Sequence, residues 1–173
     1  MWPGDAGAVL VATKGGHTRT PGGWDVDGSP AYLKRACDRS LKALGVDVIG
    51  LYQHHRPDPK VPYEETIGAL KDLLDTGKIR FAGISNADPG QIRLAHTILG
   101  DRLVSVQNEF SPRFRSSEPE IDLCAELGIA FLPWSPLGGI GRTGELSRPE
   151  TILDSVAAAE LELTAEELAR LSS

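Results

Sequence analysis

Polar and titratable side chains recur directly after short apolar runs along this chain. The residues at these positions are Lys14, His54-His55, Ser85-Asn86, Gln107-Asn108 and Ser135. Lysine and histidine can hold or transfer protons, and amide and hydroxyl groups can hydrogen-bond a ligand. Each position alone has a simpler explanation, because a lysine after a strand is usually solvated and a Ser-Asn pair is common in turns. Their order favours one shared pocket, since the ends of successive parallel strands lie side by side.

A glycine-rich segment follows the last of these runs. Gly139, Gly141 and Gly144 form a G-x-G-x-x-G pattern, which in a dinucleotide-binding turn joins a strand to a helix inside a βαβ unit. Here Pro149 follows soon afterwards, and the remaining sequence is helical in pattern, with no strand to carry a ribose-binding acid. The pattern therefore favours a glycine-rich loop over a Rossmann fold.

The elements that must position these residues alternate between apolar strands and amphipathic helices. Strands are expected at about 8–13, 47–52, 79–85, 103–107 and 129–134. Helices are expected from Pro30 to Gly45, at about 63–76, after Asp88, and at 118–127. This alternation predicts an α/β fold with a parallel sheet and right-handed crossovers. Polar residues after the strands match the face of a (β/α) barrel on which chemistry takes place.

Helix starts and one long connection are also visible in the sequence. Ser29 before Pro30 is an N-cap signal, and Asp88 with Gln91 has the spacing of a capping box, as does Thr164 with Glu167. The segment 17–28 is predicted to be a long irregular loop, a kind of segment that compact domains often keep for binding or catalysis.

Composition narrows the function classes. The 173 residues are 40% hydrophobic and 24% charged, which predicts a single globular domain over 1–173. A net charge of −6 without a basic stripe makes nucleic acid a poor partner. Cys37 and Cys124 are expected to be buried hydrophobes, with no metal site. No membrane span or export leader is recognised, so a soluble, cytoplasmic protein is expected.

The ordered set of strand-end residues resembles an aldo-keto reductase. The strings that carry this resemblance are VATKGG (11–16), SLKALGVDVIGLYQHHRPD (40–58), GKIRFAGISNAD (77–88), VQNEFSP (106–112), PWSPLGGI (133–140) and SRPETILDSVAAAELELTAEELARL (147–171). They cover nearly the whole chain in family order. The resemblance implies a (β/α)8 TIM barrel, only partial and open here with about five parallel strands, which transfers hydride between NADPH (NADP⁺) and a small aldehyde or ketone.

The resemblance also implies catalytic roles for two residues. Lys14 matches the family's catalytic lysine, which lowers the pKa of a neighbouring tyrosine acid. His55 matches the histidine that orients the substrate carbonyl, because it directly precedes an Arg-Pro pair. His54 is then expected to lie on the strand and pack.

Cofactor residues are implied in the same way. Ser85, Asn86 and Gln107 match the residues that hydrogen-bond the nicotinamide carboxamide, and Trp134 matches the aromatic residue on which the nicotinamide ring stacks. Stacking there fixes which face of the ring delivers hydride.

Further positions match the phosphate-binding and substrate regions. The loop over the cofactor phosphates corresponds to Ser135, Pro136, Leu137 and Gly139. Ser147 and Arg148 match the arm that holds the adenosine 2′-phosphate, where a guanidinium suits a phosphate geometrically. Trp24 and His17 are expected to line the substrate side.

Two parts of the family pattern are missing from this sequence. The family's catalytic aspartate and tyrosine belong to strand–helix units that precede Lys14, and Tyr32, Tyr52 and Tyr63 do not match that tyrosine. A helix and the last strand are also absent before Ser147. A barrel of about 250 residues is thus reduced to about five strands with open edges.

Three hypotheses follow from these departures. The first is a truncated aldo-keto reductase with a partial NADPH site and little turnover. The second is a non-catalytic NADP-binding or assembly subunit that completes its barrel with another chain or by self-association. The third is an enzyme split over two polypeptides, or an error in the gene model.

Overall fold

The computed structural model describes residues 9–136 and 164–167 of the chain. The predicted site residues Leu137, Gly139, Ser147 and Arg148 lie outside the described residues. The described part falls into two compact units: one contains residues 9–108 and 118–132, the other residues 109–117, 133–136 and 164–167.

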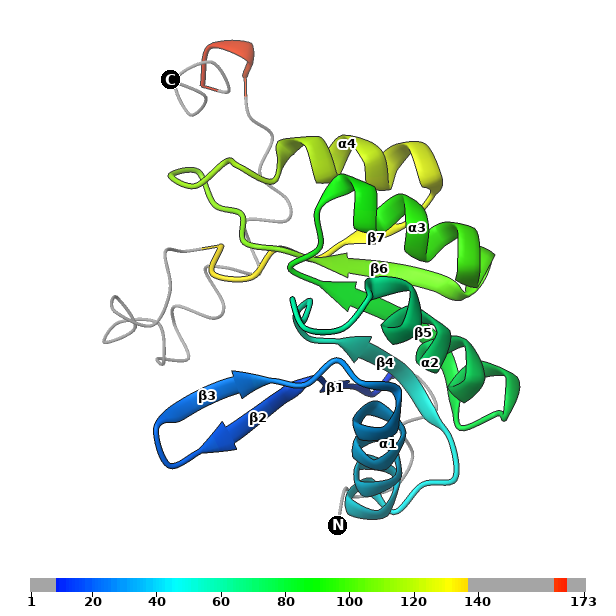
Figure 1. The fold of residues 1–173 in the computed structure, drawn as a ribbon. Helices are drawn as coiled ribbons and strands as arrows, with labels where there is room; N and C mark the ends of the chain where they lie inside the picture. Colours follow the sequence, from blue (N-terminus) through cyan, green and yellow to red (C-terminus); the bar gives the residue numbers. More distant parts are fainter. Residues whose placement is uncertain (1–8, 137–163, 168–173) are drawn as a thin grey trace. The chain divides into compact units, whose positions relative to one another are not determined.

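The first unit is built on a parallel sheet (Figure 1). Its five strands are β1 (Ala12–Gly15), β4 (Ile49–His54), β5 (Ile79–Ser85), β6 (Leu103–Gln107) and β7 (Ala130–Phe131). They lie in the order β1-β4-β5-β6-β7, every neighbouring pair is parallel, and the described strands do not close into a barrel. This confirms the predicted α/β class with an open, partial barrel sheet.

Helices connect the strands and cover one face of the sheet (Figure 1). They are α1 (Pro30–Leu44), α2 (Tyr63–Asp75), α3 (Pro89–Leu99) and α4 (Glu118–Leu127), with a short 3₁₀ turn η1 (Gly100–Arg102). The core lies between sheet and helices, where Ile67 and Leu70 of α2 pack with Ile84 and Val106 of the sheet, all fully buried. None of the helices among the described residues is long and apolar enough to cross a membrane.

The predicted helix caps are present. Ser29 Oγ accepts a hydrogen bond from Tyr32 N at 3.3 Å, and Gly45 ends α1 in the left-handed conformation with φ +68°. Asp88 and Gln91 form the predicted capping box, in which each side chain bonds the other residue's backbone N–H. These local signals therefore place the starts of α1 and α3.

The prediction of an irregular loop at 17–28 is wrong. This segment forms an antiparallel hairpin of β2 (His17–Thr20) and β3 (Gly23–Val26). The strands are polar and lack the apolar alternation that marks a half-buried strand. Cross-strand contacts hold them instead, since Arg19 pairs with Trp24 and its guanidinium lies 4.4 Å from the Trp24 ring centroid.

Three strands also have bounds that differ from prediction, and the one expected at 47–52 spans Ile49–His54. The first strand begins at Ala12 rather than residue 8, because regular pairing with β4 begins only at Ala12 and Val9 and Leu10 before it are exposed. The strand predicted at 129–134 is reduced to Ala130–Phe131. Beyond it, Trp134 forms an isolated bridge with Glu109.

The second unit contains little regular structure among its described residues. Ser111 and Phe114 pair in an antiparallel bridge. At 164–167 the predicted capping box is present: Glu167 N donates to Thr164 Oγ1 at 3.3 Å, and Thr164 N donates to Glu167 Oε2 at 2.9 Å.

Candidate active site

The carboxyl ends of β4, β5 and β6 bring four of the predicted site residues together. Ser85 pairs with Gln107 in the β5–β6 register, and the Asn86 Nδ2 amide donates to the backbone oxygen of His55 at 2.9 Å and to Ser85 Oγ at 3.0 Å. Ser85 Oγ in turn donates to the Gln107 backbone oxygen at 2.6 Å. A single hydrogen-bonded junction therefore links the ends of three strands.

Asn86 can hold this junction because of its backbone conformation. Its φ is +56°, in the left-handed region that asparagine tolerates better than most non-glycine residues. The backbone N–H of Asn86 donates to the Gln107 backbone oxygen at 3.1 Å, so the chain turns away from the sheet only after this bond. The turn directs the Asn86 side chain across the end of β5 toward β4.

Lys14 lies at the same end of the sheet. It pairs with Gln53 in register, and the next residue, Gly15, accepts a hydrogen bond from the backbone N–H of His55 at 2.8 Å. Partial burial lowers the pKa of the Lys14 ammonium below its ordinary value. Strand order and register thus place the lysine and the histidine at neighbouring strand ends.

The environment of His55 keeps its imidazole neutral at neutral pH. The pKa of His55 is lowered to about 4, mainly by burial and in smaller part by the charges of His17, Lys14 and Arg56. A neutral imidazole can donate one hydrogen bond and accept another, but it is not a proton reservoir at pH 7. Below about pH 4, His55 would instead become a cation among cations.

The hairpin adds an aromatic wall beside His55. The His17 ring stacks on the His55 ring with centroids 3.9 Å apart, and the Trp24 ring lies 5.7 Å from that of His17. These rings open onto a cavity of about 590 Å³. Its lining residues are His17, Trp24, Asp25, Val26, His55 and Arg56. The expectation that Trp24 and His17 lie on the substrate side stays a prediction, but both rings line a cavity that contains His55.

Arg56 is a lining residue that the sequence analysis did not select. Its charge lowers the pKa of both His17 and His55. The sequence feature that could have identified Arg56 as a site residue is its position directly after His55, at the end of a strand. A cation there favours negative charge on a ligand atom beside His55.

His54 packs in the core, as expected. It is fully buried in β4, and neither ring nitrogen has a hydrogen-bond partner among the described residues. Burial lowers the pKa of His54 to about 4.

The three tyrosines have structural environments. Tyr32 donates its hydroxyl to the backbone oxygen of His17 at 2.9 Å, which anchors α1 to the hairpin. The hydroxyls of Tyr52 and Tyr63 are buried without a hydrogen-bond partner among the described residues, and burial raises the pKa of both phenols. A raised pKa makes Tyr52 and Tyr63 weaker acids than an exposed tyrosine.

Three more predicted cofactor residues belong to the second unit. Trp134 accepts a hydrogen bond from Phe110 N through its backbone oxygen at 3.3 Å. Ser135 has a φ of +54°, and Pro136 is exposed. The predicted roles of Trp134, Ser135 and Pro136 therefore stay predictions.

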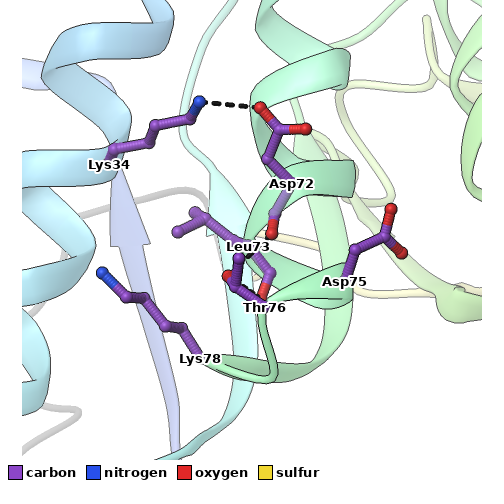
Figure 2. Close-up of a pocket in the computed structure, with 6 residues that line it drawn as sticks. All are labelled: Lys34, Asp72, Leu73, Asp75, Thr76 and Lys78. Carbon is purple, nitrogen blue, oxygen red and sulfur yellow. Dashed lines mark hydrogen bonds and ion pairs between the residues drawn. The ribbon is translucent and has the colours of Figure 1, made fainter.

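A second cavity of about 340 Å³ lies between α1 and α2, near the amino end of β5 (Figure 2). Its charged side chains pair with one another or with neighbours: Lys34 Nζ lies 2.7 Å from Asp72 Oδ2, and Lys78 bonds Asp38. Such exposed ion pairs brace two helices and contribute little free energy. In the same described part of the chain, no cluster of three His, Cys, Asp or Glu side chains is placed to hold a metal ion.

Comparison with known proteins identifies the family. The aldo/keto reductase family model matches residues 2–145. The chain is 45% identical over 132 residues to a probable aldo-keto reductase of Glycine max, covering 75% of this chain and 38% of that protein. It is 39% identical over 150 residues to an uncharacterized oxidoreductase of Schizosaccharomyces pombe, covering 86% of this chain and 47% of that protein.

A solved structure gives the same result. The holo form of an aldo-keto reductase from Bacillus halodurans superposes with a TM-score of 0.62 at 35% identity, covering 71% of this chain and 41% of that one. The chain thus spans less than half the length of these three relatives. The family model covers most of the sequence, including the strands that end in Lys14, His55, Ser85 and Gln107. The chain belongs to the aldo/keto reductase family.

Proposed function

We propose that this chain binds NADP(H) and presents a carbonyl compound to it, as an oxidoreductase that interconverts carbonyl and alcohol groups. The observation that carries the proposal is the junction at the ends of β4, β5 and β6. There the hydrogen bonds of Asn86 link His55 to Ser85, and those of Ser85 and Asn86 reach Gln107. One set of bonds thus fixes the proposed carbonyl-orienting residue relative to the proposed cofactor residues.

The residues present fit a carboxamide such as that of nicotinamide. The side-chain oxygen of Gln107 is buried and has no hydrogen-bond partner among the described residues. A buried acceptor without a donor is costly, and an amide N–H of a bound carboxamide would satisfy it. Ser85, Asn86 and Gln107 would hold the carboxamide, and the nicotinamide ring that carries it would supply the hydride.

The chain's own side chains would act on the carbonyl oxygen. The neutral His55 imidazole would donate its N–H to that oxygen and fix its direction. The charges of Lys14 and Arg56, which depress the pKa of His55, would favour the negative charge that develops on the oxygen. The stacked His17 ring would hold the His55 ring plane.

A titration of NADPH fluorescence with the purified chain tests the binding step. Wild type is expected to bind, and Gln107→Leu is expected to weaken binding roughly tenfold, the loss expected for one buried hydrogen bond. Gln91→Leu is the matched control, because it removes an amide whose bond among the described residues is the one from Asp88 N at the start of α3. An absence of binding by wild type, or equal dissociation constants for the Gln107 variant, would contradict the proposal. A repeat with NADH tests the preference for NADP(H).

A second candidate is an assembly role, in which the chain binds the nucleotide and completes its sheet with another chain. The observation that favours it is apolar exposure at one end of the sheet. Val9 and Leu10, just before β1, are 59% and 53% exposed, and Val46 and Val48, just before β4, are 43% and 50% exposed. Strand β1 is also the end strand in the order of the described sheet. Exposed apolar residues beside an edge strand are suited to packing against another chain.

A further inference from the structure

The connection between β5 and α3 leaves the sheet at Asn86, yet its backbone remains buried. Asn86 N still bonds to the backbone oxygen of Gln107, but the left-handed turn at Asn86 ends the regular ladder. The next residue, Ala87, is 1% exposed and packs within the hydrophobic core. Its peptide groups therefore need hydrogen-bond partners that β6 no longer provides through its backbone.

The side chain of Asn108 supplies both partners. Its Oδ1 accepts from Ala87 N at 3.2 Å, and its Nδ2 donates to the Ala87 oxygen at 2.9 Å. Asn108 is 6% exposed, so these bonds form away from solvent. A side-chain amide has the same donor and acceptor groups as a peptide, so Asn108 extends the β5–β6 ladder by one residue after the backbone has turned away.

We propose that Asn108 is a positioning residue for the nicotinamide carboxamide. This inference rests on the proposed function, because it gives Ser85 and Asn86 the role of binding that group. Asn108 immobilises Ala87, and Ala87 follows the two residues whose side chains form the junction with His55. Asn108 needs no contact with the cofactor itself: its two bonds hold the direction in which Asn86 turns.

The side-chain amide of Asn108 is needed because it both accepts from the Ala87 N–H and donates to the Ala87 oxygen. Aspartate in its charged form could still accept from Ala87 N, but it would place a carboxylate oxygen against the Ala87 oxygen. Leucine fills a similar volume and leaves both peptide groups of Ala87 buried without these partners. Either change should loosen the turn at Asn86 and the orientation of its side chain.

The test measures the affinity of wild type, Asn108→Asp and Asn108→Leu for two ligands, with each variant made in the full chain. NADPH contains the nicotinamide, whereas adenosine 2′,5′-bisphosphate contains only the adenosine half of the cofactor. Both variants are expected to bind NADPH roughly tenfold or more weakly, as expected for the loss of an ordered, buried hydrogen bond. Their affinity for adenosine 2′,5′-bisphosphate is expected to stay within about twofold of wild type, a small difference in free energy.

Gln91→Leu serves as the matched control. It removes one side-chain bond at the other end of the same connection, from Asp88 N to Gln91 Oε1 at 3.0 Å. It should lower the melting temperature slightly without changing the affinity for NADPH. Circular dichroism identifies any variant that fails to fold, and the milder Asn108→Asp keeps the test available if Asn108→Leu does so.

Hydrogen exchange gives a readout without any cofactor. The amide protons of Asn86 and Ala87 should exchange slowly in wild type and faster in both Asn108 variants. Unchanged NADPH affinity in folded variants would overturn the positioning role while leaving the proposed function intact. If wild type binds no NADPH, the proposed function fails, and the positioning role fails with it whatever the exchange rates are.

Discussion

At the scale of single residues, the protonation state of the His55 imidazole determines what this residue can do. Burial lowers its pKa to about 4, and the Lys14 charge contributes to that shift. We therefore expect Lys14→Met to raise the pKa of His55 toward the ordinary value without restoring it fully, because burial remains. An NMR titration of the imidazole resonances measures this directly. Lys34→Met, which removes an exposed, ion-paired lysine, is the control and should leave the His55 titration unchanged.

The same site predicts slow turnover by this chain alone. The new alkoxide needs a proton donor, and general acid catalysis contributes roughly 10²–10⁴-fold. At pH 7 His55 is neutral, and Tyr52 and Tyr63 have raised pKa values. NADPH oxidation with 4-nitrobenzaldehyde should therefore fall well below the roughly 1–10³ s⁻¹ of ordinary enzymes. Ordinary rates that Lys14→Met or His55→Ala abolishes would show that the site contains a working acid, and the expectation of slow turnover would be wrong.

His54 predicts a pH dependence of stability. Its folded pKa of about 4 lies below the ordinary 6.5, so between these values the unfolded chain binds more protons than the folded chain. The free energy of unfolding should thus fall as the pH is lowered from about 6.5 to about 4. His54→Leu removes a buried ring whose nitrogens lack partners, and it should flatten this dependence and raise the melting temperature at pH 5. Urea unfolding between pH 4.5 and 7.5 tests this, and an unchanged slope in the variant would contradict it.

At the scale of elements, the packing of side chains on the sheet face opposite the helices requires a glycine in β5. A Cβ at Gly83 would lie 2.4 Å from Ser105 Oγ and 2.8 Å from Gln53 Cγ, two side chains that hydrogen-bond each other at 3.2 Å. Gly83→Ala should therefore destabilise the chain by roughly 1–3 kcal/mol through overpacking. Gly68→Ala is the matched control in α2, where nothing lies within 4 Å of the added Cβ.

The control, Gly68→Ala, should raise the free energy of unfolding, whereas Gly83→Ala should lower it. Alanine is favoured over glycine inside a helix by up to about 1 kcal/mol. Urea midpoints of the two variants at one pH measure both effects. If Gly83→Ala proved neutral, the Gln53–Ser105 pair would be able to move, and the close packing inferred for β5 would be wrong.

Elements with strong local signals were predictable from sequence, whereas those fixed by distant contacts were not. The helix ends predicted from Ser29, Gly45 and Asp88 are confirmed, because these residues cap α1 and α3 in the structure. The two strands of the hairpin had no such signal, because they are polar and depend on pairs such as Arg19 with Trp24. The Pro-Gly-Gly run at 21–23 was the one available indication of its turn.

The candidate site was likewise predictable from the sequence only in part. Strand-end positions give the order in which Lys14, His55, Ser85 and Gln107 must meet, because parallel strands align their ends. The sequence could not show that Asn86 would direct its amide to the His55 backbone, since that depends on a left-handed turn. Nor could it show the low pKa of His55, which arises mainly from burial and in part from the charges of His17 and Lys14, both distant along the chain.

At the scale of the whole molecule, the sheet presents apolar residues at one end. Val9, Leu10, Val46 and Val48 are each at least 43% exposed, at the amino ends of β1 and β4. Leu10 reaches the neighbouring strand, since its Cδ1 lies 2.6 Å from the position of an added Cβ at Gly50. These residues therefore lie next to one another just before two adjoining strands, as a surface that pairs with another chain requires.

This surface predicts self-association of the purified chain. We expect native mass spectrometry to detect species heavier than one 18.5 kDa chain. Leu10→Lys with Val48→Lys should shift the population toward the monomer, because a buried, unpaired lysine opposes an apolar interface. Leu132→Lys is the matched control, since Leu132 is 37% exposed and follows β7, at the opposite end of the strand order. If wild type is a monomer, or if only Leu132→Lys dissociates it, the β1 end of the sheet is not the interface. NADPH titration of the double variant then separates the two candidate functions: unchanged binding by the monomer means that the nucleotide site forms within one chain, whereas lost binding means that a second chain is needed to complete it.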